Sequence, residues 1–224
     1  MSDLLLATAN RGKQREFGRL LKGLPGRMVL PQEIGLDLDV PEPHATYAEN
    51  AAAKAIAYCR ASGLPALADD SGIEVAALDW GPGPRSARLG GSAVTDRARL
   101  ILDLIGDAAD RRARMVCALA LAIPGTAPDG TPWRPRIEQF EGIMEGEIAP
   151  EPRGGGGFGY DPIFLLPSGM TTAELPEGEK DAVSHRGRAV AAALPRLRQL
   201  MAEDAPEPSG GPGADTMQLP KERE

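Results

Sequence analysis

The stretch DLLLATANRGKQREFGRLLKGL, residues 3–24, decides the fold class of this chain. An apolar run over 3–8 leads into a polar, glycine-containing loop, which predicts a buried strand that ends in a loop. A helix whose second residue is Lys13 should follow, because four apolar residues recur at the spacing i, i+3, i+4, i+7: Phe17, Leu20, Leu21 and Leu24. Strand, loop and helix in this order begin an α/β unit, so we expect an α/β fold.

Two further helices are expected in the first half of the chain. Thr46 and Glu49 form a T-x-x-E capping box before an alanine-rich helix that ends at Gly63. A strand over 64–69, LPALAD, leads directly to a pair of aspartates. The segment TDRARLILDLIG, residues 95–106, predicts a helix capped by Thr95 and ended by a glycine.

The second half predicts a hairpin and a late helix. RARMVCALALAI, residues 112–123, is apolar on both of its alternating faces, so we expect a central strand covered on both sides. Residues 124–135 are rich in turn formers, and 136–148 predict the returning strand. The late helix should be capped by Ser184 and kinked or interrupted at Pro195.

The composition is that of a globular chain with excess acid. The chain is 42% hydrophobic and 25% charged, which is enough for a core. Its net charge of −7 argues against a nucleic-acid polymer or an anionic membrane as partner. We find no apolar run near the roughly 20 residues of a membrane span, and no signal-peptide pattern at the N-terminus. Cys59 and Cys117 lie in apolar stretches, which predicts buried free thiols and a cytoplasmic location.

The organisation predicted is one domain over residues 1–202 and a tail over 203–224. The tail is rich in proline, glycine and charge, a composition typical of disorder. We find no internal repeats.

Asp69 and Asp70 are the first candidates for chemistry. Neighbouring strand residues point to opposite faces, so the two carboxylates should not share one point unless the strand has ended. One would ligate a hard cation such as Mg²⁺, while the other orients water. Taken alone, the pair is equally compatible with a solvated strand end.

Four other segments carry polar or aromatic groups of the kinds that bind nucleotides. In ATANRGK, residues 7–13, a helix start and Lys13 favour phosphate, although the spacing is not that of a Walker A loop. In RGGGGFGYDPIF, residues 153–164, glycines allow close approach, Phe158 or Tyr160 is suited to stack on a base, and Asp161 to accept hydrogen bonds from base or ribose. The remaining candidates are a basic cluster, Lys180, His185 and Arg186, and a loop acid with a helix lysine, Glu42 and Lys54.

Each segment alone is also compatible with an ordinary connection, a flexible loop or a basic surface patch. Together they supply acids for a metal, lysines for phosphates and aromatics for a base, which is what a nucleoside triphosphate requires. A noncatalytic nucleotide-binding protein would not need the acids. A phosphotransferase is disfavoured because a Walker A loop is absent.

Six motifs in order resemble the inosine triphosphate pyrophosphatase family, over about residues 4–200. They are T-x-N-x-x-K (8–13), TYAENAAAKA (46–55), LADDSGIEV (67–75), GPRSARLGG (83–91), GGFGYDPIF (156–164) and SHRGRA (184–189). Two places depart from the family's usual pattern: EPHAT (42–46) stands where Glu-Thr-Gly is common, and Arg85 where an aromatic or aliphatic residue is common.

The resemblance implies an elongated mixed central sheet flanked by helices, with two lobes around a cleft, usually in a homodimer. It implies Mg²⁺-dependent hydrolysis of non-standard purine nucleoside triphosphates such as ITP, dITP and XTP to the monophosphate and pyrophosphate. It implies a metal held by Asp70 and Glu42, and proton acceptance by Asp70. For the mechanism we expect Asp69 or Asp70 to take the proton from water, and Lys13 and Lys54 to stabilise the leaving pyrophosphate. The implied substrate contacts are Thr8, Ala9, Asn10, Arg11, Gly12, Lys13, Ser71, Phe158, Gly159, Tyr160, Asp161, Lys180, His185 and Arg186.

Overall fold

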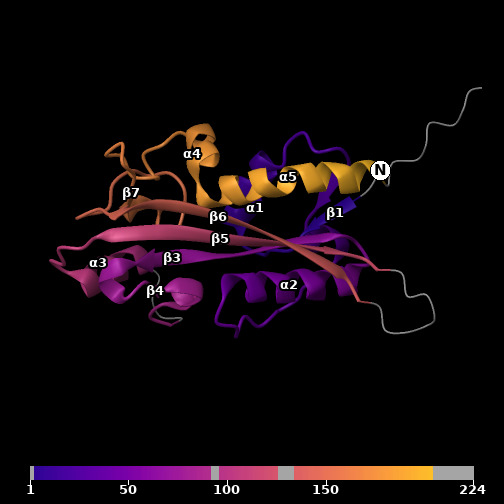
Figure 1. Ribbon diagram of the computed structural model, residues 1–224, viewed down its shortest axis with the longest axis horizontal. Helices are drawn as coiled ribbons and strands as arrows, with labels where there is room; N and C mark the ends of the chain where they lie inside the picture. The colour runs from indigo at the N-terminus through magenta and orange to yellow at the C-terminus, as the bar shows by residue number, and fades with distance from the viewer. Residues whose placement is uncertain (1–2, 92–95, 126–133, 204–224) are drawn as a thin grey trace, which may run out of the picture.

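The computed structural model describes residues 3–91, 96–125 and 134–203. A mixed sheet runs through its centre in the order β2-β1-β3-β5-β6-β7, with β4 paired to β3 (Figure 1). The strand β1 is parallel to both β2 and β3, whereas the remaining pairs are antiparallel. This arrangement confirms the expected α/β fold with a mixed sheet flanked by helices.

The elements have the following bounds. The strands are β1 Asp3–Leu6, β2 Arg27–Val29, β3 Ala66–Val75, β4 Gly81–Pro82, β5 Arg112–Ile123, β6 Arg136–Ile148 and β7 Phe164–Leu165. The α-helices are α1 Arg11–Leu20, α2 Tyr47–Ser62, α3 Arg97–Ile105, α4 Glu177–Val183 and α5 His185–Glu203. Short 3₁₀ helices are η1 Pro31–Ile34, η2 Ala76–Leu78, η3 Gly83–Arg88 and η4 Asp161–Ile163. No helix in these described parts is long and apolar enough to cross a membrane.

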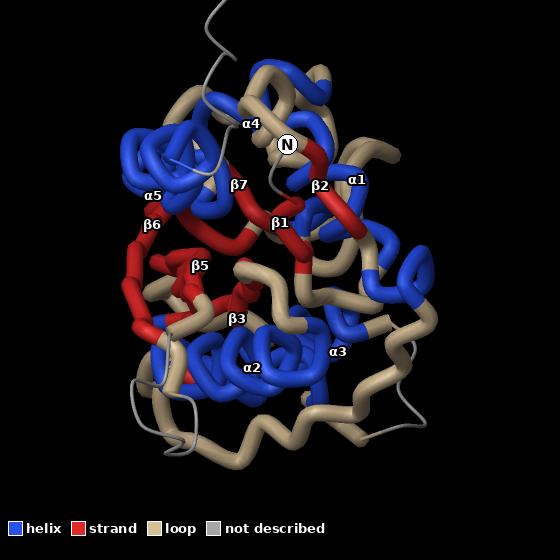
Figure 2. The backbone as a smooth tube through the Cα atoms, turned by 90° about the vertical axis from the view of Figure 1, so that its right-hand side faces the viewer, coloured by secondary structure: helices blue, strands red, loops and turns tan. Residues whose placement is uncertain are grey.

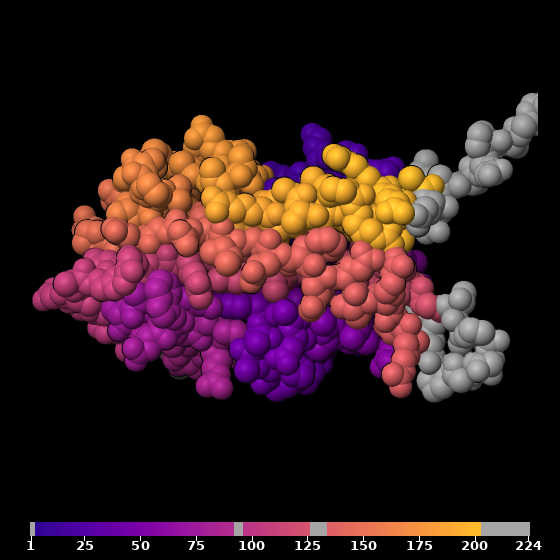
Figure 3. Space-filling view, in the orientation of Figure 1, coloured from indigo at the N-terminus to yellow at the C-terminus, as the bar shows by residue number. Residues whose placement is uncertain are grey.

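Helices cover both faces of the sheet, α1 and α5 on one side and α2 on the other (Figures 1 and 2). Cys117, Leu119 and Leu121 of β5 belong to the core under α1 and α5. Alternate residues of the same strand, including Val116 and Ala118, pack against α2. The prediction of a central strand covered on both faces is therefore confirmed. The molecule is elongated (Figure 3), and its long axis follows the direction of β5 and β6 (Figure 1).

The helix boundaries follow from local capping. Thr46 accepts a hydrogen bond from the Glu49 N–H and caps α2, which ends at Gly63 in a left-handed conformation, as expected. Lys13 is the third residue of α1, one later than expected, because Asn10 is the cap. Asp96 caps α3, while the expected cap Thr95 lies outside the described residues.

The late helix was expected to be kinked or interrupted at Pro195, and it is not interrupted. α5 begins after Ser184, whose hydroxyl accepts from the Gly187 N–H at 3.0 Å, and it runs through Pro195 to Glu203. Residues beyond the proline, such as Leu197 and Leu200, remain buried in the main core. This packing offsets the roughly 3 kcal/mol that a helix-internal proline costs. The expected tail lies, apart from Glu203, outside the described residues.

The strand that carries the paired aspartates is longer than predicted. β3 continues to Val75, and Asp69 and Asp70 lie within it, opposite Leu119 and Ala118 of β5. The prediction that the strand ends at the pair is wrong. The two side chains consequently project from opposite faces of the sheet, one toward α1 and α5 and the other toward α2. Cys59 and Cys117 are buried free thiols, as predicted.

Gly72 allows β3 to pack closely against η3. A Cβ at this position would meet the Ser86 hydroxyl, the Gly83 carbonyl oxygen at 2.5 Å and the Tyr47 hydroxyl at 2.9 Å.

We expect Gly72→Ala to lower the free energy of unfolding in urea by about 1–3 kcal/mol because the site is already full. Gly155→Ala is the control, since an added Cβ there has nothing within 4 Å. An equal loss of unfolding free energy in the two variants would contradict the close packing of Gly72 against η3.

Candidate active site

A cavity of about 500 Å³ lies where the start of α1, the loop before α2, strand β3 and the start of α5 meet. Most of the predicted site residues line it: Thr8, Asn10, Lys13, Glu42, Lys54, Asp70, Ser71, Phe158, Gly159, Tyr160, Asp161, His185 and Arg186. Five of the predicted site residues do not line the cavity: Ala9, Arg11, Gly12, Asp69 and Lys180. Segments that are far apart in the sequence therefore line the same cavity.

The start of α1 brings Asn10, its cap, and Lys13 to the cavity. The Asn10 side chain accepts from the Gly12 N–H at 2.8 Å and from the Lys13 N–H at 3.2 Å. Lys13 Nζ lies 2.9 Å from the buried Asp69 Oδ2. This ion pair holds the Lys13 side chain against β3, at the cavity wall.

A second lysine comes from α2. Lys54 Nζ forms an ion pair with Glu42 and donates to the Asp69 carbonyl oxygen at 3.0 Å. The loop that carries Glu42 is also held by Arg88, which donates to the Glu42 carbonyl oxygen at 2.6 Å. Both predicted lysines thus reach the cavity from different helices.

The two neighbouring aspartates have opposite electrostatic environments. Burial alone would raise the pKa of Asp69, but Lys13 and Arg186 outweigh it and hold this pKa well below its ordinary value. Burial raises the pKa of Asp70, a hydrogen bond from Asn50 lowers it, and the nearby Glu42 charge raises it again, with a net increase. Asp69 is therefore a fixed anion among cations, whereas Asp70 is a carboxyl group facing the cavity.

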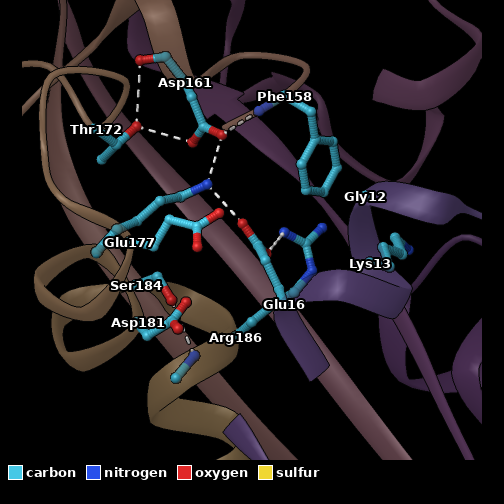
Figure 4. A network of polar contacts seen from close by, with 12 residues as sticks. Gly12, Lys13, Glu16, Phe158, Asp161, Thr172, Glu177, Asp181, Ser184 and Arg186 are labelled. Carbon is cyan, nitrogen blue, oxygen red and sulfur yellow. Dashed lines mark hydrogen bonds and ion pairs between the residues drawn. The ribbon is translucent and has the colours of Figure 1, made fainter. Parts of the chain in front are cut away.

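A buried charge network supports one wall of the cavity (Figure 4). Glu16 lies 2.6 Å from Lys180 Nζ through one carboxylate oxygen and 2.9 Å from Arg186 Nη1 through the other. Lys180 Nζ also lies 2.5 Å from Asp161 Oδ2, and Thr172 donates to Asp161 Oδ1 at 2.9 Å. Both acids and both cations are almost fully buried. Their charges compensate each other, as buried charges must.

Phe158 packs against both the cations of this network and the start of α1. Its ring is 5.1 Å from the Arg186 guanidinium and 5.4 Å from Lys180 Nζ. A Cβ on Gly12 would lie only 2.8 Å from the ring, so a glycine is required at that point of α1. The Phe158 N–H donates to Asp161 Oδ2 at 2.7 Å. The Asp161 carboxylate, expected to contact a base or ribose, therefore already has protein donors on both oxygens.

His185 is a buried histidine at the cavity wall. Burial, followed by the charges of Arg186 and Lys180, lowers its pKa well below the ordinary value. Its Nδ1 has no hydrogen-bond partner among the described residues.

We expect the ring of His185 to stay unprotonated between about pH 6 and 8, where an ordinary histidine titrates. Because its folded pKa lies below its unfolded pKa, the free energy of unfolding should fall as the pH drops below about 6.5. Histidine ring NMR signals measure this directly. The chain has only two histidines, so His44→Ala assigns the His185 signal. A His185 midpoint near its ordinary value would contradict the buried, unpaired ring.

The sequence reasoning missed Glu16 and Asn50. Glu16 connects the two cations of the network, and Asn50 is fully buried and bonded to Asp70. Glu16 lies four residues after the candidate residue Gly12 and therefore on the same face of the helix, which was the one indication in the sequence that it belongs to the site. Asn50 stands within the motif TYAENAAAKA, but its spacing did not distinguish it from a surface residue.

Comparisons with known proteins find relatives over most of the chain. The sequence profile of the Ham1 family matches residues 4–196. A dITP/XTP pyrophosphatase of Ralstonia nicotianae is 48% identical over 206 residues, covering 88% of this chain and 98% of that protein. One of Symbiobacterium thermophilum is 45% identical over 205 residues, covering 89% and 97%. A solved HAM1 protein of Coxiella burnetii has a TM-score of 0.75 and 40% identity, covering 91% of this chain and 100% of that one.

The fold and the cavity together define a class of protein: an α/β protein with a mixed sheet, in which acids, lysines and aromatic residues line one cavity. The chain belongs to the Ham1 family, which confirms the resemblance drawn from its sequence motifs.

Proposed function

We propose that this chain hydrolyses non-standard purine nucleoside triphosphates, such as dITP, XTP and ITP, to the nucleoside monophosphate and pyrophosphate. The observation that carries the proposal is that one cavity joins the acids Glu42 and Asp70, the lysines Lys13 and Lys54, and the Phe158–Asp161 segment. The relatives named dITP/XTP pyrophosphatases match this chain over nearly its whole length, which supports the same reaction.

Asp70 and Glu42 are the proposed ligands of a Mg²⁺ ion. No group of three or more metal-binding side chains occurs among the residues that the structure describes. Two carboxylates fit Mg²⁺ nevertheless, because this ion commonly takes one or two carboxylates, substrate phosphates and waters. Burial is the main cause of the raised pKa of Asp70, and the nearby Glu42 charge adds to it, so a cation beside the two acids would relieve a repulsion that the structure contains. When bound, Mg²⁺ would orient the phosphates and offset part of their charge.

Asp70 is proposed as the group that accepts the proton of the attacking water. It lines the cavity, and a positioned carboxylate is a common general base. Asp69 is off the cavity and is held ionised by Lys13 and Arg186. We therefore assign Asp69 to charge compensation, with Lys13 and Lys54 stabilising the negative charge of the leaving pyrophosphate.

Base selection is proposed to depend on the wall that includes His185 and Arg186. Hypoxanthine and xanthine present an acceptor at position 6, whereas adenine presents a donor. A mismatched buried group costs about 1–3 kcal/mol. Arg186 already donates to Glu16 and Ser71, while His185 Nδ1 has no partner among the described residues. A protein donor at this wall favours the 6-oxo purines over adenine. Guanine also has a 6-oxo group, so its rejection must depend on its 2-amino group.

We propose a homodimer in the cytoplasm that removes deaminated purine nucleotides and binds neither a nucleic-acid polymer nor a membrane. The net charge of −7 supports the last point.

A product assay with ATP, GTP, ITP, XTP and dITP, with and without Mg²⁺, tests the function. We expect monophosphate and pyrophosphate from ITP, XTP and dITP, dependent on Mg²⁺, and little from ATP or GTP. Nucleoside diphosphate as product would indicate a phosphotransferase or another phosphatase. Binding without turnover would indicate a noncatalytic nucleotide-binding protein.

A further inference from the structure

Asn50 is a polar side chain with no solvent exposure, in the first turn of α2. It does not line the cavity. A buried amide is stable only when its donors and acceptor are satisfied, so its partners show what it holds in place.

The partners of Asn50 come from two different segments. Its Oδ1 accepts from the His44 N–H at 3.0 Å. Its Nδ2 donates to Asp70 Oδ2 at 3.0 Å and, more weakly, to the His44 carbonyl oxygen at 3.4 Å. A backbone N–H can only donate, so the amide oxygen must face His44 and the amide nitrogen must face Asp70. The orientation of the amide is therefore fixed by chemistry.

These bonds connect the two proposed metal ligands. His44 is two residues after Glu42, in the loop before α2, whereas Asp70 lies in β3. The second oxygen of Asp70 accepts from the Ser71 N–H at 2.9 Å, so the carboxylate is held from two directions. The exposed His44 side chain takes no part, because both His44 contacts are made by its backbone.

We propose that Asn50 is a positioning residue that fixes the Asp70 carboxylate and the Glu42 loop in one arrangement. It acts through these groups and does not touch the substrate. The activity part of this inference rests on the proposed function, since it concerns the same cavity. Replacing a residue that orients a metal ligand typically lowers metal affinity or activity by about 10–100-fold.

Two variants separate the two contacts. Asn50→Asp keeps an oxygen for the His44 N–H but replaces the donor to Asp70 with a second carboxyl oxygen. Asn50→Leu removes both contacts. His44→Ala is the control, because it keeps both backbone contacts.

We expect kcat/KM for dITP to fall about 10–100-fold in N50D and N50L, with a higher Mg²⁺ concentration for half-maximal rate. Hydrogen exchange of the His44 amide should stay slow in N50D and become fast in N50L. The ¹³C shift of the Asp70 carboxyl carbon should change in both variants. The H44A control should match the wild type in rate and in the Asp70 shift.

Wild-type kcat/KM in N50D, or a rate loss no larger than the loss of folded protein in thermal melts, would overturn the proposal. So would an unchanged Asp70 carboxyl shift in both variants. If the wild type does not hydrolyse dITP, the proposed function fails, and the exchange and ¹³C measurements still decide the role of Asn50.

Discussion

Asp70→Asn should abolish hydrolysis of dITP while leaving the protein folded. The change removes a cavity-facing carboxylate that is the proposed proton acceptor and metal ligand. Loss of a positioned base alone typically costs about 10²–10⁴-fold in rate, so we expect at least about a 10³-fold fall in kcat. An amide can accept from only one of the two donors that now bind Asp70, the Asn50 amide and the Ser71 N–H, so we expect the free energy of unfolding to fall by about 1–3 kcal/mol. Removal of a charge that burial disfavours offsets part of this loss, and the protein stays folded. Steady-state kinetics and urea unfolding measure the two effects.

Asp69→Asn is the matched control for this prediction. Asp69 contacts Lys13 and Arg186 in the interior of the sheet, so neutralising it leaves buried cations short of a partner. We expect this variant to be clearly less stable than D70N. Wild-type turnover with unchanged Mg²⁺ dependence in D70N would refute the role of Asp70. Equal stability of the two variants would contradict the different environments of the neighbouring carboxylates.

Glu16→Ala should have the largest effect on stability of the substitutions considered. Glu16 is 4% exposed and is the partner of both Lys180 and Arg186. Breaking a buried ion pair by removing one partner costs about 3–5 kcal/mol, because the remaining charge is left uncompensated. We expect a loss of that size in the free energy of unfolding in urea. Because the network supports Phe158, affinity for the substrate should fall as well.

An exposed ion pair provides the control for Glu16. Asp103 pairs with Arg99 one turn earlier on α3, and both side chains are more than half exposed. Such pairs contribute about 0.2–0.5 kcal/mol, so Asp103→Ala should be nearly neutral. A similarly small loss for Glu16→Ala would show that the buried network does not stabilise the fold.

The elements of regular pattern could be predicted from the sequence. The alternation in residues 112–123 and 136–148 predicted the β5–β6 hairpin, and Thr46 and Gly63 predicted the ends of α2. These signals are local, since capping and periodicity depend on residues a few positions apart. The end of β3 was predicted wrongly for the same reason. Two adjacent acids predict the end of a strand by local criteria. The groups that stabilise them inside come from distant elements: cations on α1 and α5 for Asp69, and Asn50 on α2 for Asp70.

The predicted site residues were found from motif resemblance and complementary chemistry, and most of them share the cavity. The supporting residues could not be found this way. Glu16 bonds to partners 164 and 170 positions later, and no local pattern announces such a contact. Asn50 reaches Asp70 across 20 positions, from one element to another. Such residues become visible only when the packing of α1, α2, β3 and α5 is known.

Hydrolysis of dITP in H₂¹⁸O tests the central claim most directly, because the label follows the phosphorus that water attacks. The account predicts dIMP carrying one ¹⁸O and unlabelled pyrophosphate. Label in pyrophosphate, or dIDP with labelled phosphate, would contradict attack at the α-phosphorus within this cavity.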